Sequence, residues 1–165
     1  SRIIVSGEER DPNIEAPTGA TFSDFASLRS DQVRHPDGIP MFKPPYSHIT
    51  AIDMNTGEHL WQLPIGETPE RVANHPDLQD MDIPTTGTGR NAAMLVTKTA
   101  FMYTSHASDG TPMLYLVDKV SGDQVGSVEI PDSVNYGMST YGHDGKQYVM
   151  LQTGAKLTAM ALGDF

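Results

Sequence analysis

A hairpin signature occurs twice in this sequence, 65 residues apart, and it restricts the fold more than any other pattern. Residues 51–61 (AIDMNTGEHLW) and 116–126 (LVDKVSGDQVG) align without a gap, so that Asp53 corresponds to Asp118 and Gly57 to Gly122. In each copy the glycine supplies the positive φ of a tight turn, and the aspartate can bond the backbone of that turn. Such a repeat predicts a propeller or an array of similar sheets, in which each sheet covers its neighbour.

Short strands joined by turns account for most of the chain after residue 47. Strand pairs are predicted at 48–53 with 59–64, 92–96 with 100–105, 113–118 with 124–130, and 136–141 with 147–152, followed by a last strand at 156–162. The chain of 165 residues also contains 15 glycines and 12 prolines, and so many breakers disfavour a helical bundle. The predicted fold class is therefore all-β, made of propeller blades that are four-stranded antiparallel sheets.

The chain divides into an irregular N-terminal arm, residues 1–40, and propeller blades in residues 41–165. Within the arm we predict a short strand over residues 1–5 and a weak helical stretch over 23–30 that Ser23 can cap. The polar segment 66–91 is predicted to be mostly loop, with a helical turn at 69–74. Two or three blades do not close a ring, so we expect a fragment, or a chain that needs a partner.

Charge and composition exclude several classes of function. There are 21 acidic and 11 basic residues, a formal net charge of −10, which repels nucleic acid and anionic lipid. Cysteine is absent, which excludes disulfides, thiol catalysis and cysteine metal sites within this chain. The histidines lack metal-ligand spacing, and no apolar run approaches the roughly 18 residues of a membrane span. No metal ligand is therefore predicted here.

Several motifs together resemble one enzyme family. Residues 51–66 (A-x-D-x-x-T-G-x-x-x-W-x-x-x-x-G) are similar to the tryptophan-docking motif of quinoprotein dehydrogenases, which bind pyrroloquinoline quinone (PQQ) in an eight-bladed β-propeller. The KPPY segment at 43–46 looks like the Pro-Pro-aromatic segment of the glucose-dehydrogenase-like branch. Further similar segments, in the order of the family, are PIGETP at 64–69, NHP at 74–76, LVTKT at 95–99 and DGKQYV at 144–149. The resemblance covers about residues 38–163 and implies the C-terminal blades of a longer enzyme.

The chain also departs from the family pattern. The second hairpin copy has no tryptophan: the gapless alignment places Gly126, next to Val125, opposite Trp61. Residues 88–92 (TGRNA) stand where the family often has a Gly-Gly-rich stretch, and residues 136–141 (YGMSTY) lack the proline of a Gly-x-Pro-Met-Thr-Tyr segment. Most calcium ligands, the catalytic aspartate and the cofactor-stacking residues of the family lie in earlier blades, so the resemblance implies that this chain alone is not a complete enzyme.

The resemblance implies part of a PQQ-dependent dehydrogenase that oxidises an alcohol or sugar hydroxyl by hydride transfer to PQQ, with calcium as Lewis acid. The implied partners are a larger chain that carries the remaining blades, which residues 1–40 would grip, and a cytochrome or ubiquinone as electron acceptor. The implied location is the periplasm. Two alternatives stay open: a propeller scaffold or binding module that has lost the cofactor, and an independent small β domain that is stable as a monomer.

Loops at 41–47, 86–92 and 104–110 are expected to converge on the propeller axis, where the resemblance implies the cofactor. PQQ is a flat tricarboxylate, so Lys43 and Arg90 are candidate partners of its carboxylates, and Lys43 alternatively of a quinone oxygen. Tyr46 is a candidate pocket wall and Asn91 a further cofactor-binding residue. The plainer alternatives are a solvated lysine before a rigid Pro-Pro and a tyrosine that only covers the hairpin.

Asp109 falls near a position where the glucose-oxidising branch has an aspartate beside the cofactor, so it is the candidate catalytic residue. It would orient a base or bond a cofactor-binding side chain; alternatively it only forms an Asp-Gly turn. His106 is a second candidate base, or else an exposed loop histidine. Trp61 is predicted to pack on the next sheet and hold the blades together, or else to be an ordinary core tryptophan of a hairpin.

Overall fold

The computed structural model describes residues 2–5, 26–29, 37, 39–78 and 80–161. The chain divides into two compact units, Ser1–Met41 and Phe42–Phe165. Each unit is described by itself below. Among the described residues, no helix combines the length and the apolar character needed to span a membrane.

In the first unit, β1 (Arg2–Val5) pairs antiparallel with β2 (Ala26–Arg29), with Arg2 opposite Arg29. The strand predicted at the N-terminus is confirmed over residues 2–5. The helical stretch predicted over residues 23–30 is wrong for residues 26–29, which form β2; Ser23 lies outside the described residues. A short helix gains few internal hydrogen bonds for the cost of its nucleation, whereas pairing with β1 satisfies the same backbone groups.

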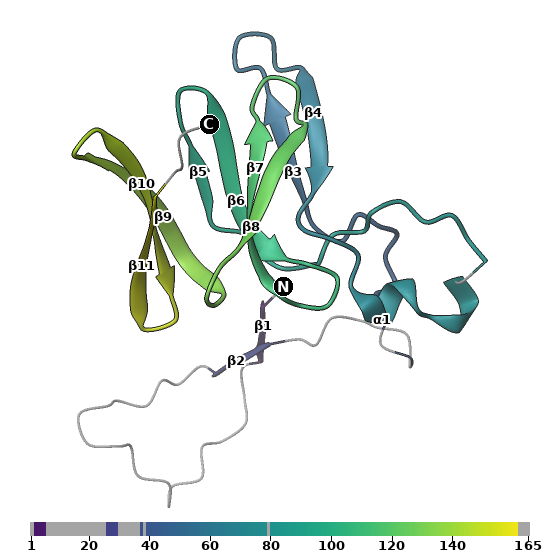
Figure 1. Ribbon diagram of the computed structural model, residues 1–165. Coiled ribbons are helices and arrows are strands. Elements are labelled where there is room, and N and C mark those ends of the chain that lie inside the picture. Colours follow the sequence, from purple (N-terminus) through teal and green to yellow (C-terminus); the bar gives the residue numbers. More distant parts are fainter. Residues whose placement is uncertain (1, 6–25, 30–36, 38, 79, 162–165) are drawn as a thin grey trace, which may run out of the picture. The chain divides into compact units, whose positions relative to one another are not determined.

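The second unit contains three antiparallel sheets that follow one another along the chain (Figure 1). The first sheet contains β3 (His48–Ile52) and β4 (His59–Pro64). The second contains β5 (Met94–Val96), β6 (Ala100–His106), β7 (Pro112–Asp118) and β8 (Gln124–Glu129). The third contains β9 (Val134–His143), β10 (Lys146–Thr153) and β11 (Lys156–Ala161). The predicted strand pairs are confirmed, and the second sheet has the four strands of a propeller blade.

The long connection between the first two sheets contains little regular structure. It includes α1 (Glu70–Ala73), at the helical turn predicted for residues 69–74, and a 3₁₀ turn at Pro76–Leu78. Val72 is the buried residue of α1. The rest of the connection runs back to β5 and passes the ends of β3, β4 and β6, which positions the loop described in the next subsection.

The two copies of the hairpin signature form matching turns. Gly57 donates its backbone N–H to the Asp53 carbonyl oxygen at 2.7 Å, and Gly122 donates to that of Asp118 at 2.8 Å. The two glycines have φ of 77° and 81°, conformations that strain any residue with a Cβ atom. Each aspartate also accepts a backbone N–H two residues further on. The repeat seen in the sequence is therefore a structural repeat.

Trp61 on β4 connects the first sheet to the turn of the second. Its indole Nε1–H donates to the Lys119 carbonyl oxygen at 3.0 Å, and its ring lies against Gly122. A Cβ atom built on Gly122 would lie only 2.7 Å from Cγ of Trp61. The Trp61 ring also contacts the Phe101 ring, with centroids 6.2 Å apart. The prediction that Trp61 packs on the next sheet is confirmed.

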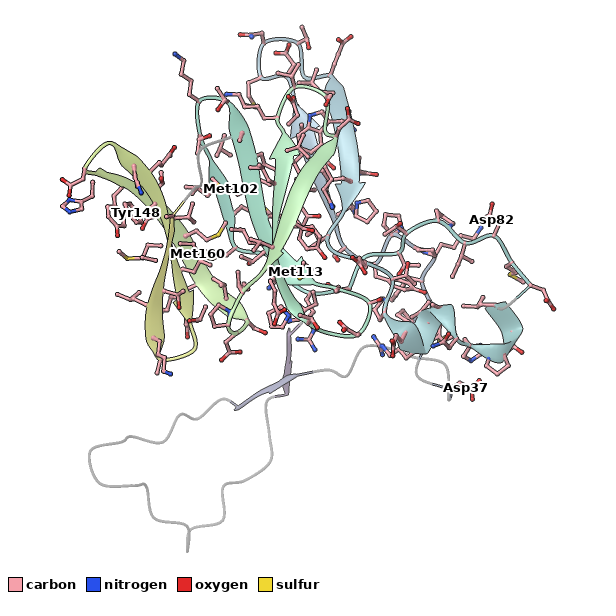
Figure 2. The ribbon with its side chains drawn as sticks, in the orientation of Figure 1. Asp37, Asp82, Met102, Met113, Tyr148 and Met160 are labelled. Carbon is pink, nitrogen blue, oxygen red and sulfur yellow. The ribbon has the colours of Figure 1, made fainter. Side chains whose placement is uncertain are left out.

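Two apolar cores separate the three sheets. Between the first and second sheets lie residues of β3, β6 and β7, with the segment that follows β4: Ile49, Ile65, Phe101, Tyr103, Tyr115 and Val117. Between the second and third sheets lie Ala93, Met102, Leu114, Ile130, Val134, Val149 and Leu151, with Met160 packed against them. Figure 2 shows Met102 and Met160 at this second junction. Because each core is shared by two sheets, neither sheet buries its apolar face alone.

Candidate functional site

Three loop segments meet at the end of the sheets where β4 and β6 finish. Tyr46 donates its backbone N–H to the Thr86 carbonyl oxygen at 2.7 Å, and the Gly89 N–H donates to Oγ of Ser47 at 3.0 Å. Thr88 Oγ1 lies 3.3 Å from Oγ of Ser105, the penultimate residue of β6. These contacts confirm that segments 41–47, 86–92 and the end of β6 come together; their position on a propeller axis stays a prediction.

Glycines allow this close approach of backbones. A Cβ atom on Gly87 would lie 2.7 Å from the Ser47 carbonyl oxygen, and one on Gly66 would lie 2.8 Å from the His106 carbonyl oxygen. Both glycines have positive φ, 70° and 75° respectively. Side chains at these two positions would push the loops apart, so the sequence around Gly66 and Gly87 is suited to bring them together.

The cofactor-binding candidates lie on this loop cluster with their polar groups unused. Lys43, Arg90 and Asn91 are exposed, and Tyr46 is partly buried. Within the part of the chain that the structure describes, none of these four side chains makes a hydrogen bond or an ion pair, although the backbone around them is well bonded. Their assignment to a cofactor stays a prediction.

Asp109 lies in the loop that joins β6 to β7. Its Oδ1 accepts the backbone N–H of Thr111 at 2.8 Å, and Gly110, with φ of 93°, donates its N–H to the Ala107 carbonyl oxygen. The backbone and side-chain hydrogen bonds from Thr111 lower the pKa of the exposed Asp109 carboxyl group. The carboxylate thus forms the Asp-Gly turn considered above, and the catalytic role stays a prediction.

His106, at the end of β6, is partly buried and bonds the segment before the third sheet. Its Nε2 lies 2.9 Å from Oγ of Ser133, which directly precedes β9, whereas its Nδ1 is buried without a hydrogen-bond partner. Burial, and then the positive charge of Arg90, lower the pKa of His106 below its usual value. The imidazole is therefore neutral at neutral pH, and it joins the second sheet to the start of the third.

The carboxylate of Glu67 lies in the same region. Oε2 of Glu67 accepts the Ser108 backbone N–H at 2.9 Å, and the backbone N–H of Glu67 donates to the His106 carbonyl oxygen at 3.2 Å. Tyr115 donates its hydroxyl to that same carbonyl oxygen at 3.3 Å, and burial followed by the Glu67 charge raises the pKa of Tyr115. These bonds fix the end of β6 and leave the Glu67 carboxylate already engaged.

Sequence reasoning did not single out Ser133, Thr88 or Glu67. Glu67 and Thr88 lie in the quoted segments 64–69 and 88–92 but were not chosen as candidates there, and Ser133 lies in none of the quoted motifs. The signal that connects them is spatial: Ser133 is 27 positions from the histidine that it contacts. The cluster as a whole offers a guanidinium, an ammonium, amide and hydroxyl groups, and a neutral imidazole, a set suited to bind a planar acid.

Comparison with known proteins gives one family and several relatives. Residues 5–149 match the family described as "PQQ: Glucose/ethanol/alcohol dehydrogenase, beta-propeller domain". The chain is 33% identical over 119 residues to the glycerol dehydrogenase large subunit of Gluconobacter oxydans (strain 621H), and equally so to that of Gluconobacter thailandicus. It is 29% identical over 136 residues to a probable quinate dehydrogenase (quinone) of Xanthomonas campestris pv. juglandis.

The coverage of these matches is unequal. The alignments include 71% of this chain and 15% of each glycerol dehydrogenase large subunit, and 78% of this chain and 16% of the quinate dehydrogenase. The chain thus spans about 15% of the length of the curated relatives that it matches. No solved structure matches the chain significantly.

Proposed function

Since this chain belongs to the family of PQQ-dependent glucose, ethanol and alcohol dehydrogenases and represents part of their β-propeller domain, we propose that it supplies the C-terminal blades of such an enzyme. The proposed reaction is the oxidation of an alcohol or sugar hydroxyl group by hydride transfer to PQQ, assisted by calcium. The single observation that carries the proposal is the family match over residues 5–149, which includes the whole loop cluster.

The residues of the loop cluster fit the cofactor. PQQ is flat and carries three carboxylates, and when bound it supplies a two-electron acceptor. Arg90 and Lys43 would hold carboxylates, because their cationic groups have no ion-pair partner among the described residues. Tyr46, half-buried at the same junction, would form part of the pocket wall, and Asn91 would donate its amide.

Asp109 is proposed as a positioning residue in this site. Its low pKa keeps the carboxylate charged, so it can orient a base or hold a cofactor-binding side chain of another blade. We assign no calcium ligand to this chain. The proposal places the calcium ligands in the other blades of the enzyme, where oxygen ligands for a hard cation would have to be supplied.

The substrate and the partners belong to the same proposal. The names of the relatives mention glycerol and quinate, which both carry several hydroxyl groups, and this supports a small polyol, alcohol or sugar as the substrate. We further propose that the remaining blades lie in a larger chain or in a longer form of this one. Electrons would pass to a cytochrome or to ubiquinone, and the enzyme would work in the periplasm.

The test uses the complete dehydrogenase that contains this sequence, freed of cofactor and titrated with PQQ in the presence of calcium. We expect quinone absorbance to appear in the protein fraction and an alcohol or sugar to reduce an artificial dye. Arg90→Ala should weaken PQQ binding about tenfold, the effect of losing one charged hydrogen-bond partner. The control variant Lys98→Ala removes an equal charge from the β5–β6 turn, at the other end of β6, and should bind PQQ as the wild type does.

A second arm addresses Asp109. Asp109→Asn keeps the side-chain oxygen that accepts the Thr111 N–H but removes the charge, so stability should hold while kcat falls about a hundredfold. Unchanged kcat would assign Asp109 to its turn alone. Failure of the wild-type assembly to bind PQQ would reject the enzyme and leave the propeller scaffold, which the lack of a tryptophan in the second hairpin copy favours.

A further inference from the structure

The imidazole of His106 has one nitrogen in a hydrogen bond and one nitrogen buried without a partner. Nε2 lies 2.9 Å from Oγ of Ser133, and Nδ1 is the only buried side-chain nitrogen or oxygen in the described part of the chain that lacks a partner. A neutral imidazole carries its single proton on one of these two nitrogens. Where that proton lies decides which group donates in the contact with Ser133.

The surroundings favour the proton on Nε2. A proton on Nδ1 would leave a buried N–H donor without an acceptor, and orphaned donors of this kind are rarer in folded proteins than acceptors with an unused lone pair. With the proton on Nε2, His106 donates to Oγ of Ser133, and only a lone pair is left unmatched. The hydroxyl of Ser133 therefore acts as an acceptor toward the histidine.

This assignment leaves the hydroxyl proton of Ser133 free for another group. Ser133 is half-buried, and its hydroxyl makes no other hydrogen bond within the described ranges. Its backbone N–H is already bonded to Oδ1 of Asp132 at 2.7 Å, which fixes the position of the residue ahead of β9. Ser133 thus presents an oriented O–H donor at the loop end of the second sheet.

Arg90 lies on the same junction. Its backbone N–H donates to Oγ1 of Thr88 at 3.4 Å, and that hydroxyl lies 3.3 Å from Oγ of Ser105, the residue before His106. After burial, the positive charge of Arg90 is the second cause that lowers the pKa of His106. Arg90 and Ser133 therefore lie on two segments that both contact the end of β6, the first at Ser105 through Thr88 and the second at His106.

The acidic groups nearby are each bonded to a backbone N–H. Glu67 accepts from Ser108, Asp109 from Thr111 and Asp132 from Ser133, at 2.7 to 2.9 Å. None of them pairs with Arg90 in the described residues. The guanidinium of Arg90 and the hydroxyl of Ser133 are therefore not bonded to a carboxylate of the described residues. A carboxylate group of a ligand can accept hydrogen bonds from both.

We propose that Ser133, oriented by His106, forms with Arg90 a subsite that binds one carboxylate group of a ligand. Ser133 and Arg90 touch the ligand, and His106 is a positioning residue that acts through Ser133. The inference rests on the proposed function for the identity of the ligand, which is either the cofactor, through one of its carboxylates, or a hydroxy-acid substrate. The chemistry of the subsite is the same for both sources.

The experiment compares pairs of variants in the complete dehydrogenase. Ser133→Ala removes the hydroxyl and Ser133→Thr keeps it; His106→Leu removes the Nε2 donor, and His106→Gln keeps an N–H donor at a similar reach. Three quantities are measured: the Kd of the cofactor-free enzyme for PQQ, the KM for quinate and for glycerol, and the Kd for citrate as a plain carboxylate probe. Thermal unfolding identifies any variant that fails to fold.

If the subsite binds a carboxylate of the cofactor, the Kd for PQQ should rise about tenfold in Ser133→Ala and in His106→Leu. It should stay nearly unchanged in Ser133→Thr and in His106→Gln, which keep the donor. A substrate carboxylate predicts that the KM for quinate rises in the same two variants while that for glycerol holds. If Ser133→Ala binds PQQ, quinate and citrate as tightly as the wild type does, the proposed subsite is wrong. Citrate binding that depends on Ser133, in an enzyme that takes no PQQ, supports the subsite and rejects only the proposed function.

Discussion

Individual side chains at the loop end of the second sheet differ in how much of their hydrogen-bonding capacity is already used. Asp109 and Glu67 accept backbone N–H groups, whereas Arg90 and Lys43 have no partner in the described residues. His106 lies between these cases, with one nitrogen bonded and one buried and unmatched. Cationic donors without a partner, beside carboxylates that already accept a backbone N–H, suit a site for an anionic ligand.

The titration of His106 predicts a pH dependence of stability. Its pKa is lowered in the folded protein by burial and by Arg90, so between the folded and unfolded pKa values the unfolded chain binds more protons. Stability therefore rises with pH through this window and is lost as the pH falls below the unfolded value of about 6.5. The test is the free energy of unfolding of the complete protein, measured by denaturant titration at pH values from about 5 to 8.

His106→Gln is the control for this dependence, because glutamine keeps a donor for Ser133 but does not titrate. The variant should unfold with a flatter pH profile below neutrality, while its stability at pH 8 stays close to that of the wild type. A wild-type profile that is equally flat would show that the imidazole is freely protonated in the folded protein, and would remove the basis for a neutral, donating His106.

At the scale of secondary-structure elements, the two hairpin turns are alike in backbone and different in surroundings. Gly57 and Gly122 have nearly the same φ and the same hydrogen bond to the preceding aspartate. A Cβ atom on Gly57 meets nothing within 4 Å, whereas one on Gly122 would collide with the indole of Trp61. The same substitution at both positions therefore imposes the same backbone strain, but only at Gly122 does it also create a packing clash.

We predict that Gly122→Ala destabilises the protein by about 1–3 kcal/mol more than Gly57→Ala, the usual cost of overpacking. The difference is measured as the free energy of unfolding from denaturant titration of the complete protein. In a Trp61→Ala background the indole is absent, so the two alanine variants should then become equally costly. A difference that persists without the indole would mean that Trp61 is not what restricts position 122.

Element prediction was accurate where the information is local. The alternating strands and the Gly-containing turns of residues 48–161 were placed within a few residues, because turn chemistry and side-chain alternation act over short distances. The helical interpretation of residues 26–29 failed, because the partner strand β1 lies more than twenty residues earlier in the sequence. A short segment has no strong preference of its own, so its pairing decides its structure.

At the scale of the whole molecule, the third sheet carries apolar side chains on both faces, and the second sheet covers one of these faces. Val149 and Leu151 face the core shared with the second sheet. On the other face the rings of Tyr141 and Tyr148 stack with centroids 5.2 Å apart, and Leu157 is 72% exposed. An apolar sheet face of this kind is expected to be covered when a further blade packs beside it.

We predict that Leu157→Glu lowers the melting temperature of the complete dehydrogenase, because it places a charge in the junction with the next blade. The control is Val120→Glu, a residue 78% exposed that lies in the β7–β8 turn and not on a sheet face. Calorimetry should show a lower unfolding temperature for the first variant and little change for the second. Equal unfolding temperatures would mean that no blade covers this face.

The sequence by itself determined the all-β class, the repeated turn, the role of Trp61 and the family, because these depend on residues close together in the chain or on a fixed motif. Only the tertiary structure decided that segments 41–47 and 86–92 meet the end of β6, that His106 bonds Ser133, and that Glu67 accepts the backbone N–H of Ser108. These contacts join positions far apart in sequence, and short-range patterns carry no information about which distant groups the packing of the sheets brings together.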